Sequence, residues 1–168
     1  MRIKNLIVFC LSLAIVAADQ ATKLIALNDF YEGESVSVIP GFFNLTLTFN
    51  KGVAFGLLAD LPDPTRQVLI ASATLTALGV IFFLLIKHYR HDFVAQLALA
   101  AIVGGALGNI IDRLRLGKVV DFLDFYYASY HWPAFNLADS AVCLGVLVLM
   151  FRPTKACKVS PAATKAVS

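Results

Sequence analysis

Charged side chains are scarce in this chain of 168 residues: 14 are lysine or arginine and 11 are aspartate or glutamate, whereas 59% of all residues are hydrophobic. The mean hydropathy is +0.77. This composition excludes an ordinary water-soluble domain and an intrinsically disordered chain, because both need more polar and charged surface. The net charge of +3 is too small and too scattered to indicate a nucleic-acid partner. The composition therefore predicts an integral membrane protein.

Several common functional signatures are missing as well. The chain has 3 cysteines, and their spacing indicates neither a metal site nor a disulfide framework. It has no H-E-x-x-H zinc helix and no G-x-S-x-G nucleophile turn. We therefore expect no metal and no cofactor.

Four apolar stretches approach the length of about 20 residues that a membrane-spanning helix needs. They cover residues 6–27, 68–86, 93–111 and 136–151, and we expect an all-α bundle of four transmembrane helices. A cleavable secretory signal is the alternative interpretation of the first stretch, because basic residues precede a short apolar run there. Against it, apolar residues resume at Leu24 with helical spacing, so that the helix continues.

The basic residues are distributed unevenly between the two ends of the predicted helices. With both termini in the cytoplasm, that side holds eight basic residues and one acidic residue, or +7, and the other side holds six basic and ten acidic residues, or −4. Positive charge favours the cytoplasmic side. Segments 28–67 and 112–135 should therefore face outward, and the membrane domain should comprise residues 1–152. Residues 153–168 have the composition of a disordered cytoplasmic tail.

The two outer segments have different patterns. Residues 43–50 alternate apolar with polar side chains, which predicts a half-buried strand, and residues 35–39 can pair with it across a Pro-Gly turn. A small extracytoplasmic β-sheet is expected there. The second segment is rich in aromatic rings that favour the membrane interface: Phe122, Phe125, Tyr126, Tyr127, Tyr130 and Trp132.

Ionisable residues within a membrane helix suggest function, because each is costly unless paired or solvated. Asp139 has no cation three or four residues away on its own helix, and Asp121 precedes it by only 18 residues. Two neighbouring carboxyl groups separate their pKa values, so that one can act as a base and the other as an acid. Such a pair can activate water against a peptide bond. The alternative is that Asp139 is only a favourable residue at a helix N-terminus.

Two further features have structural interpretations beside the functional one. Asp19 and Lys23 are four residues apart in the order that favours an ion pair, which on its own would serve only to make the helix end tolerable. Gly104 and Gly108 indicate a close helix-packing face, which would let Asn109 approach a neighbouring backbone.

Five motifs occur in order along the chain. They are Asp19-Gln20-x-Thr22-Lys23, residues 50–56 (NKGVAFG), Gly104-Gly105-x-x-Gly108-Asn109-x-x-Asp112-Arg113, Val119-Val120-Asp121-Phe122 and Phe135-Asn136-x-Ala138-Asp139-Ser140. Through these motifs the chain resembles lipoprotein signal peptidase (signal peptidase II), a bacterial membrane aspartic peptidase, up to about Phe151. Lys51 and Gly56 depart from the residues expected at their positions.

The resemblance implies an aspartic endopeptidase with Asp121 and Asp139 as its catalytic dyad. It also implies a set of residues that support the site or bind the substrate: Asp19, Lys23, Asn50, Gly52, Gly105, Asn109, Asp112, Arg113, Asn136 and Ala138. The implied substrate is a prolipoprotein whose cysteine carries a diacylglyceryl group, cleaved on the amino side of that cysteine. The implied location is the bacterial cytoplasmic (inner) membrane, among its lipids, with the site near the outer interface. No oligomeric state is implied, and Asp124 matches no motif position.

Two other functions are compatible with the intramembrane carboxyl groups. One is a small proton-coupled transporter or channel, although its relay should extend to the middle of the membrane. The other is a non-catalytic membrane chaperone of the same fold. Which aspartate is the base and which the acid is left open.

Overall fold

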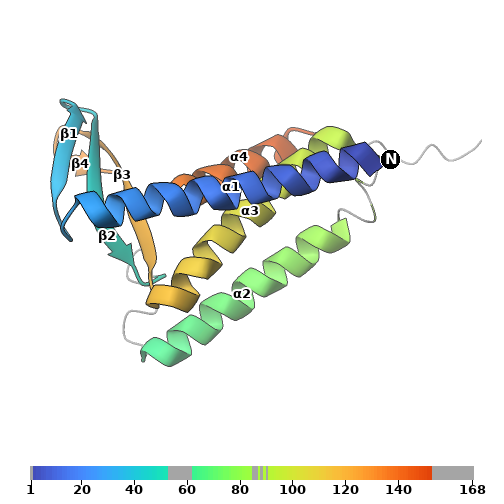
Figure 1. The fold of residues 1–168 in the computed structure, drawn as a ribbon, viewed down its shortest axis with the longest axis horizontal. Coiled ribbons are helices and arrows are strands. Elements are labelled where there is room, and N and C mark those ends of the chain that lie inside the picture. Colours follow the sequence, from blue (N-terminus) through green and yellow to red (C-terminus); the bar gives the residue numbers. More distant parts are fainter. Residues whose placement is uncertain (1, 53–61, 85–86, 88, 90, 153–168) are drawn as a thin grey trace, which may run out of the picture.

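The computed structural model describes residues 2–52, 62–84, 87, 89 and 91–152. The predicted tail, residues 153–168, lies outside them, as do residues 53–61 of the first outer segment. Along the chain the described elements are α1 (Arg2–Asp29), β1 (Ser35–Ile39), β2 (Phe43–Asn50), α2 (Asp63–Leu84), α3 (Phe93–Leu116), β3 (Val119–Tyr127), β4 (Tyr130–His131) and α4 (Leu137–Met150). The helices form a bundle, and the sheet lies across one end of it (Figure 1).

Each predicted apolar stretch coincides with a helix, but the third helix is longer than expected. The sequence predicted its end at residue 111, whereas α3 continues to Leu116, so Asp112 and Arg113 lie within its last turns. Arg113 and Arg115 favour this extension because positive charge stabilises a helix C-terminus. The helix ends at Gly117, whose φ of 71° suits glycine and whose N–H bonds the carbonyl of Arg113.

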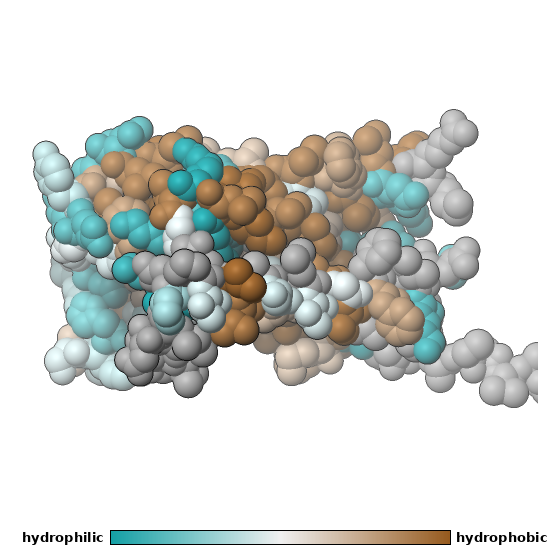
Figure 2. Space-filling model, turned by 90° about the horizontal axis from the view of Figure 1, so that it is seen from below, coloured by the Kyte–Doolittle hydropathy of each residue, from teal (hydrophilic) through white to brown (hydrophobic). Residues whose placement is uncertain are grey.

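The helices differ in the length of their apolar segments. Residues Ile3–Asp29 of α1 and Phe93–Leu116 of α3 are long and apolar enough to span one, whereas the apolar segments Val68–Ile81 and Leu137–Met150 are shorter. Figure 2 shows apolar side chains gathered along the middle of the molecule and polar ones toward the sheet end. This distribution fits a membrane protein with mostly helical structure.

The sheet has four antiparallel strands in the order β1-β2-β3-β4. The predicted pairing of residues 35–39 with 43–50 is confirmed, with Val36 opposite Leu45. The aromatic segment, for which the sequence predicted no secondary structure, forms β3 and β4, and β3 pairs with β2 along most of its length. Its first four residues are all buried, so this strand lacks the apolar–polar alternation that would have revealed it.

A small apolar core fastens the sheet to the end of α1. It consists of Ala26 from α1, Leu47 from β2, and Val120 and Phe122 from β3, all less than a tenth exposed. Phe122 and Val120 lie on either side of Asp121 in the chain, so the packing that buries them also fixes the position of that carboxyl group. The core thus holds β3 against the C-terminal end of α1.

Candidate active site

Asp121 and Asp139 come from different elements that meet where the sheet covers the helix ends. Asp121 lies on β3 opposite Thr48 of β2 and is 1% exposed. Asp139 lies in the first turn of α4 and is half-buried. The negative charge of Asp139 is close enough to raise the pKa of Asp121.

Asn136 contacts both aspartates, the carboxyl group of one and the backbone of the other, and is itself fully buried. Its Nδ2 donates to Oδ1 of Asp121 at 2.7 Å, and its Oδ1 accepts from the backbone N–H of Asp139 at 2.9 Å. Asn136 is the N-cap of α4, and the second of these bonds is the capping bond. One side chain therefore begins the helix that carries one aspartate and holds the other aspartate directly.

Asn109 of α3 makes the matching contact with Asp139. Its Nδ2 donates to Oδ1 of Asp139 at 2.7 Å, while its Oδ1 accepts from Nζ of Lys23 at 2.9 Å and from Nδ2 of Asn136 at 3.3 Å. Because Lys23 occupies the amide oxygen, the amide nitrogen is left to face Asp139. The orientation of the Asn109 amide is thus set from α1.

Lys23 forms salt bridges with two other carboxyl groups, behind Asp121 and Asp139. Its Nζ lies 2.9 Å from Asp19 and 2.8 Å from Asp112, and all three side chains are 3% exposed or less. The predicted pairing of Asp19 with Lys23 is confirmed. The two carboxylates also accept backbone N–H groups, Asp19 from Ala138 at 2.9 Å and Asp112 from Val120 at 3.2 Å.

Each of these backbone contacts lies one residue before an aspartate of the first pair. Ala138 precedes Asp139, and Val120 precedes Asp121. The ion cluster formed by Asp19, Lys23 and Asp112 therefore anchors the start of α4 and the start of β3 together. It acts on the site through the backbone.

Gln20 belongs to this network but was not among the predicted site residues. Its Nε2 lies 2.9 Å from Oδ1 of Asp112, 3.2 Å from the carbonyl of Gly108 and 3.3 Å from Oδ2 of Asp19. Its position in the motif Asp19-Gln20-x-Thr22-Lys23 was the one feature of the sequence that could have identified it. Its role depends on α3 lying beside α1, which no local pattern reveals.

The predicted glycine face is confirmed, since α3 approaches its neighbours through residues without side chains. A Cβ on Gly105 would overlap the carbonyl oxygen of Ala138, and one on Gly108 would overlap Oδ2 of Asp19. A Cβ on Gly104 would come within 2.8 Å of the carbonyl oxygen of Ser12. Close approach of α3 to α1 and α4 is what brings Asn109 within reach of both Lys23 and Asp139.

The remaining predicted residues lie at the edge of this network. The Asn50 side chain lies near Asp121 and opposes the increase in its pKa, and Oδ1 of Asn50 accepts the N–H of Gly52, whose φ is 84°. Arg113 donates to the carbonyl of Asn109 at 3.3 Å. Residues 53–56 of the second motif lie outside the described residues.

Asp124 lies apart from the two pairs. It accepts from Nδ2 of Asn44 at 3.0 Å and contacts Nδ1 of His131 at 2.9 Å, on the part of the sheet farther along β3. Because Asp124 comes three positions after Asp121, an odd number, the two carboxyl groups point to opposite faces of the strand. Asp124 is also buried on β3, so a substitution there can serve as a control for one at Asp121.

The environment of Asp121 favours its protonated form. Burial is the largest cause of the increase in its pKa to about 7, and the charge of Asp139 adds to it, whereas hydrogen bonds from Asn136 and Asn50 and the charge of Lys23 oppose it. Near neutral pH this group can thus either hold or accept a proton. A pair of carboxyl groups that shares a proton can perform general acid–base chemistry.

A cavity of about 510 Å³ opens beside Asp121. It is lined by the end of β2, the start of α2 and the segment before α4, through Thr48, Phe49, Asn50, Lys51, Arg66, Asp121, Pro133 and Ala134. Its volume is in the range of pockets that bind small molecules or short peptide segments. A substrate in this cavity would meet the carboxyl group of Asp121 directly.

Comparison with known proteins agrees with this geometry. The family model of Signal peptidase (SPase) II matches residues 11–154. Proteins named lipoprotein signal peptidase are 47% identical in Syntrophus aciditrophicus, over 88% of this chain and 92% of that protein, and 46% identical in Desulforapulum autotrophicum, over 90% and 94%. A bacterial membrane enzyme structure solved at 1.9 Å superposes with a TM-score of 0.75 at 34% identity, covering 85% of this chain and 89% of that one. The chain belongs to the signal peptidase II family.

Proposed function

We propose that Asp121 and Asp139 are the catalytic dyad with which this signal peptidase II, a membrane protease, removes the signal peptide from lipoprotein precursors. The observation that carries the proposal is the hydrogen-bonded link between them, in which Asn136 holds Asp121 at 2.7 Å and Asn109 holds Asp139 at 2.7 Å. Both contacts come from neutral amides. The cavity beside Asp121 gives a peptide access to it.

The reaction needs one carboxylate and one carboxylic acid. The carboxylate takes a proton from a water molecule while the water oxygen attacks the scissile carbonyl carbon, and the acid donates its proton to the carbonyl oxygen. The tetrahedral intermediate then collapses, the C–N bond breaks, and the leaving amine takes a proton from the dyad. Burial of Asp121, which raises its pKa to about 7, supports the availability of both protonation states near neutral pH.

The membrane arrangement belongs to the same proposal. All four helices cross the bacterial cytoplasmic membrane within a domain of residues 1–152, both termini lie in the cytoplasm, and the dyad lies near the outer interface. The excess of basic residues at the predicted cytoplasmic ends supports this orientation. The substrate is cleaved on the amino side of its diacylglyceryl-modified cysteine, which would lie at the same depth as the dyad.

Replacement of either aspartate by asparagine tests the dyad. Asp121→Asn and Asp139→Asn should each lower cleavage of a lipid-modified precursor in detergent by about a thousandfold or more, because water activation needs both groups. Asp124→Asn is the matched control, since it changes a buried aspartate on the same strand and should leave turnover close to wild type.

Circular dichroism and thermal unfolding should show that all three variants remain folded. Near-normal turnover by either dyad variant would refute the assignment. The transporter alternative would be favoured instead if reconstituted vesicles without precursor showed a proton flux that the same substitutions abolish.

A further inference from the structure

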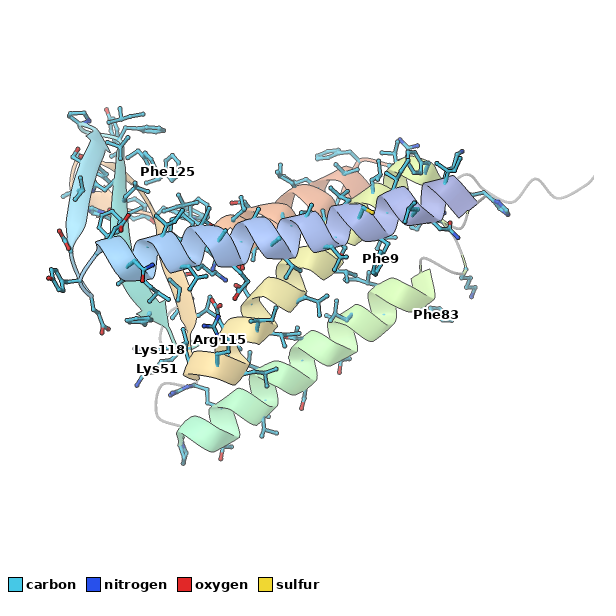
Figure 3. All side chains as sticks on the ribbon, in the orientation of Figure 1. Phe9, Lys51, Phe83, Arg115, Lys118 and Phe125 are labelled. Carbon is cyan, nitrogen blue, oxygen red and sulfur yellow. The ribbon has the colours of Figure 1, made fainter. Side chains whose placement is uncertain are left out.

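Three basic side chains meet at one corner of the outer surface, where α3 ends and the β2–β3 pair opens. Lys51 follows the last residue of β2, Lys118 precedes the first residue of β3, and Arg115 lies in the last turn of α3. Figure 3 labels these three residues in the same part of the molecule. We refer to Lys51, Arg115 and Lys118 as the basic corner.

The strand register brings two of these cations together. Asn50 lies opposite Val119, and continuing this antiparallel register by one residue places Lys51 opposite Lys118. Both lysines lie just outside the strands, and like charges so placed repel each other. Of the described carboxylates, none lies within salt-bridge distance of Lys51, Arg115 or Lys118. This arrangement is complementary to an anion that bridges the two lysines.

Part of the basic corner is held in position. Nζ of Lys118 lies 3.3 Å from the centre of the Phe49 ring, and Nη1 of Arg115 lies 3.4 Å from Oε1 of Gln20. Phe49 and Lys51 both line the cavity beside Asp121. An anion at the basic corner would therefore lie at the mouth of the substrate cavity.

The depth of the basic corner matches that of lipid phosphates. The 24 residues of α3 span about 36 Å at 1.5 Å per residue, which exceeds the hydrocarbon thickness of about 30 Å by about one turn. That turn contains Arg115, with Leu114 82% exposed and Leu116 40% exposed on either side of it. Exposed leucines next to cations suit acyl chains below a phosphate better than they suit a peptide in water.

We propose that the basic corner binds the phosphate of an anionic phospholipid of the phosphatidylglycerol class in the outer leaflet. The lipid would offset the repulsion between Lys51 and Lys118 and would form part of the cavity wall through its headgroup. The leaflet follows from the orientation under Proposed function, but the binding itself does not depend on the catalytic assignment.

The test compares two double variants that remove the same charge at opposite ends of the molecule. Lys51→Gln/Lys118→Gln removes the opposed lysines of the basic corner. Lys4→Gln/Lys87→Gln is the control, because these lysines also lie over phenylalanine rings, 5.5 Å from that of Phe93 and 5.3 Å from that of Phe83. Each purified protein is mixed in detergent with phosphatidylglycerol or with phosphatidylcholine of the same acyl chains, and native mass spectrometry measures the bound lipid.

Wild type should bind phosphatidylglycerol more tightly than phosphatidylcholine, and the corner variant should lose about fivefold in affinity for phosphatidylglycerol per lysine removed. The control should retain most of the preference. Equal losses in the two double variants would overturn the proposal, because they would show a general charge effect.

Unchanged lipid binding would also overturn it. If the corner variant then cleaved precursors with acidic residues after the cysteine more slowly than wild type, the partner would be the substrate polypeptide. Failure of the dyad assignment would leave the lipid result untouched, since the binding measurement contains no precursor.

Discussion

Two pairs of aspartates share one hydrogen-bonded network, yet the protein treats them in opposite ways. Asp19 and Asp112 both contact the ammonium group of Lys23, at 2.9 and 2.8 Å. Asp121 and Asp139 receive hydrogen bonds from the neutral amides of Asn136 and Asn109. Among the described residues, no lysine or arginine forms a salt bridge with either member of this second pair.

The difference shows how a buried carboxyl group can be assigned to structure or to chemistry. A carboxylate held by an ammonium group makes charge-assisted hydrogen bonds, which fix its position. A carboxyl group held by amides can exist in either protonation state, because an amide supplies both a donor and an acceptor. We therefore interpret the Lys23 cluster as the support and the amide-held pair as the reactive groups.

Asn109 lies where the two pairs meet. Its oxygen accepts from Lys23 and its nitrogen donates to Asp139, so the ammonium group of Lys23 determines which end of the amide faces Asp139. The fixed orientation costs nothing at the moment of reaction, because it is established on folding.

The largest expected effect is the loss of stability when Lys23, the cation shared by Asp19 and Asp112, is removed. Lys23→Met leaves two fully buried carboxylates without a counter-charge, and the free energy of unfolding should fall by about 3–5 kcal/mol. Chemical unfolding in mixed micelles measures this loss. Lys4→Met, an exposed lysine on the same helix, is the control and should change stability by less than about 0.5 kcal/mol.

A second substitution separates charge from packing in the same experiment. Adding Asp112→Asn to Lys23→Met removes one of the two uncompensated charges and should restore part of the lost stability. If the double variant were no more stable than Lys23→Met, lost packing rather than unpaired charge would explain the effect.

Asn109→Asp should have the next largest effect, and it acts on activity more than on stability. The new carboxylate still accepts from Lys23 but has no N–H for Asp139, so the contact at 2.7 Å becomes repulsive. We expect kcat/KM for precursor cleavage to fall by about a hundredfold, which corresponds to about 2.7 kcal/mol.

Asn44→Asp provides the matched control, because Asn44 also donates to an aspartate, Asp124, at 3.0 Å. It introduces the same repulsion on the sheet, away from the dyad, and should leave kcat unchanged. Similar losses of kcat in both variants would mean that the network around Asn109 has no special relation to catalysis.

Much of the fold could be predicted from the sequence because its signals are local. Length and apolar composition located all four helices, and alternation of side chains identified the β1–β2 hairpin. The absence of a cation near Asp139 on its own helix correctly implied that the partner of its carboxyl group comes from another element, which is Asn109 of α3.

The features that were missed depend on contacts between distant segments. Strand β3 is covered on both faces by the rest of the protein, which removes the alternation expected of a half-buried strand. The carboxylates of Asp19 and Asp112 bind backbone N–H groups of Ala138 and Val120, and a backbone contact leaves no trace in residue identity. The sequence therefore named Asp19 and Asp112 but could not predict the backbone hydrogen bonds that they accept.

The smallest expected effect is the dependence of stability on pH, which tests whether Asp121 titrates near neutral pH. Burial and the charge of Asp139 raise the pKa of Asp121 from an ordinary 3.8 to about 7, so between these values the folded protein binds more protons than the unfolded chain. The resulting stability is fully present below the lower value and is lost as pH rises through the upper one. From about pH 5 to about pH 8, the free energy of unfolding should fall by about 2.6 kcal/mol.

Thermal unfolding of the detergent-solubilised protein across this range measures the loss, and three variants assign it. Asp121→Asn should abolish this contribution, whereas Asp124→Asn should leave the slope unchanged. Asp139→Asn removes the charge that adds to the effect of burial, so the loss should occur at lower pH than in wild type. If the free energy of unfolding of Asp121→Asn still fell with rising pH, the titrating group would lie elsewhere in the protein.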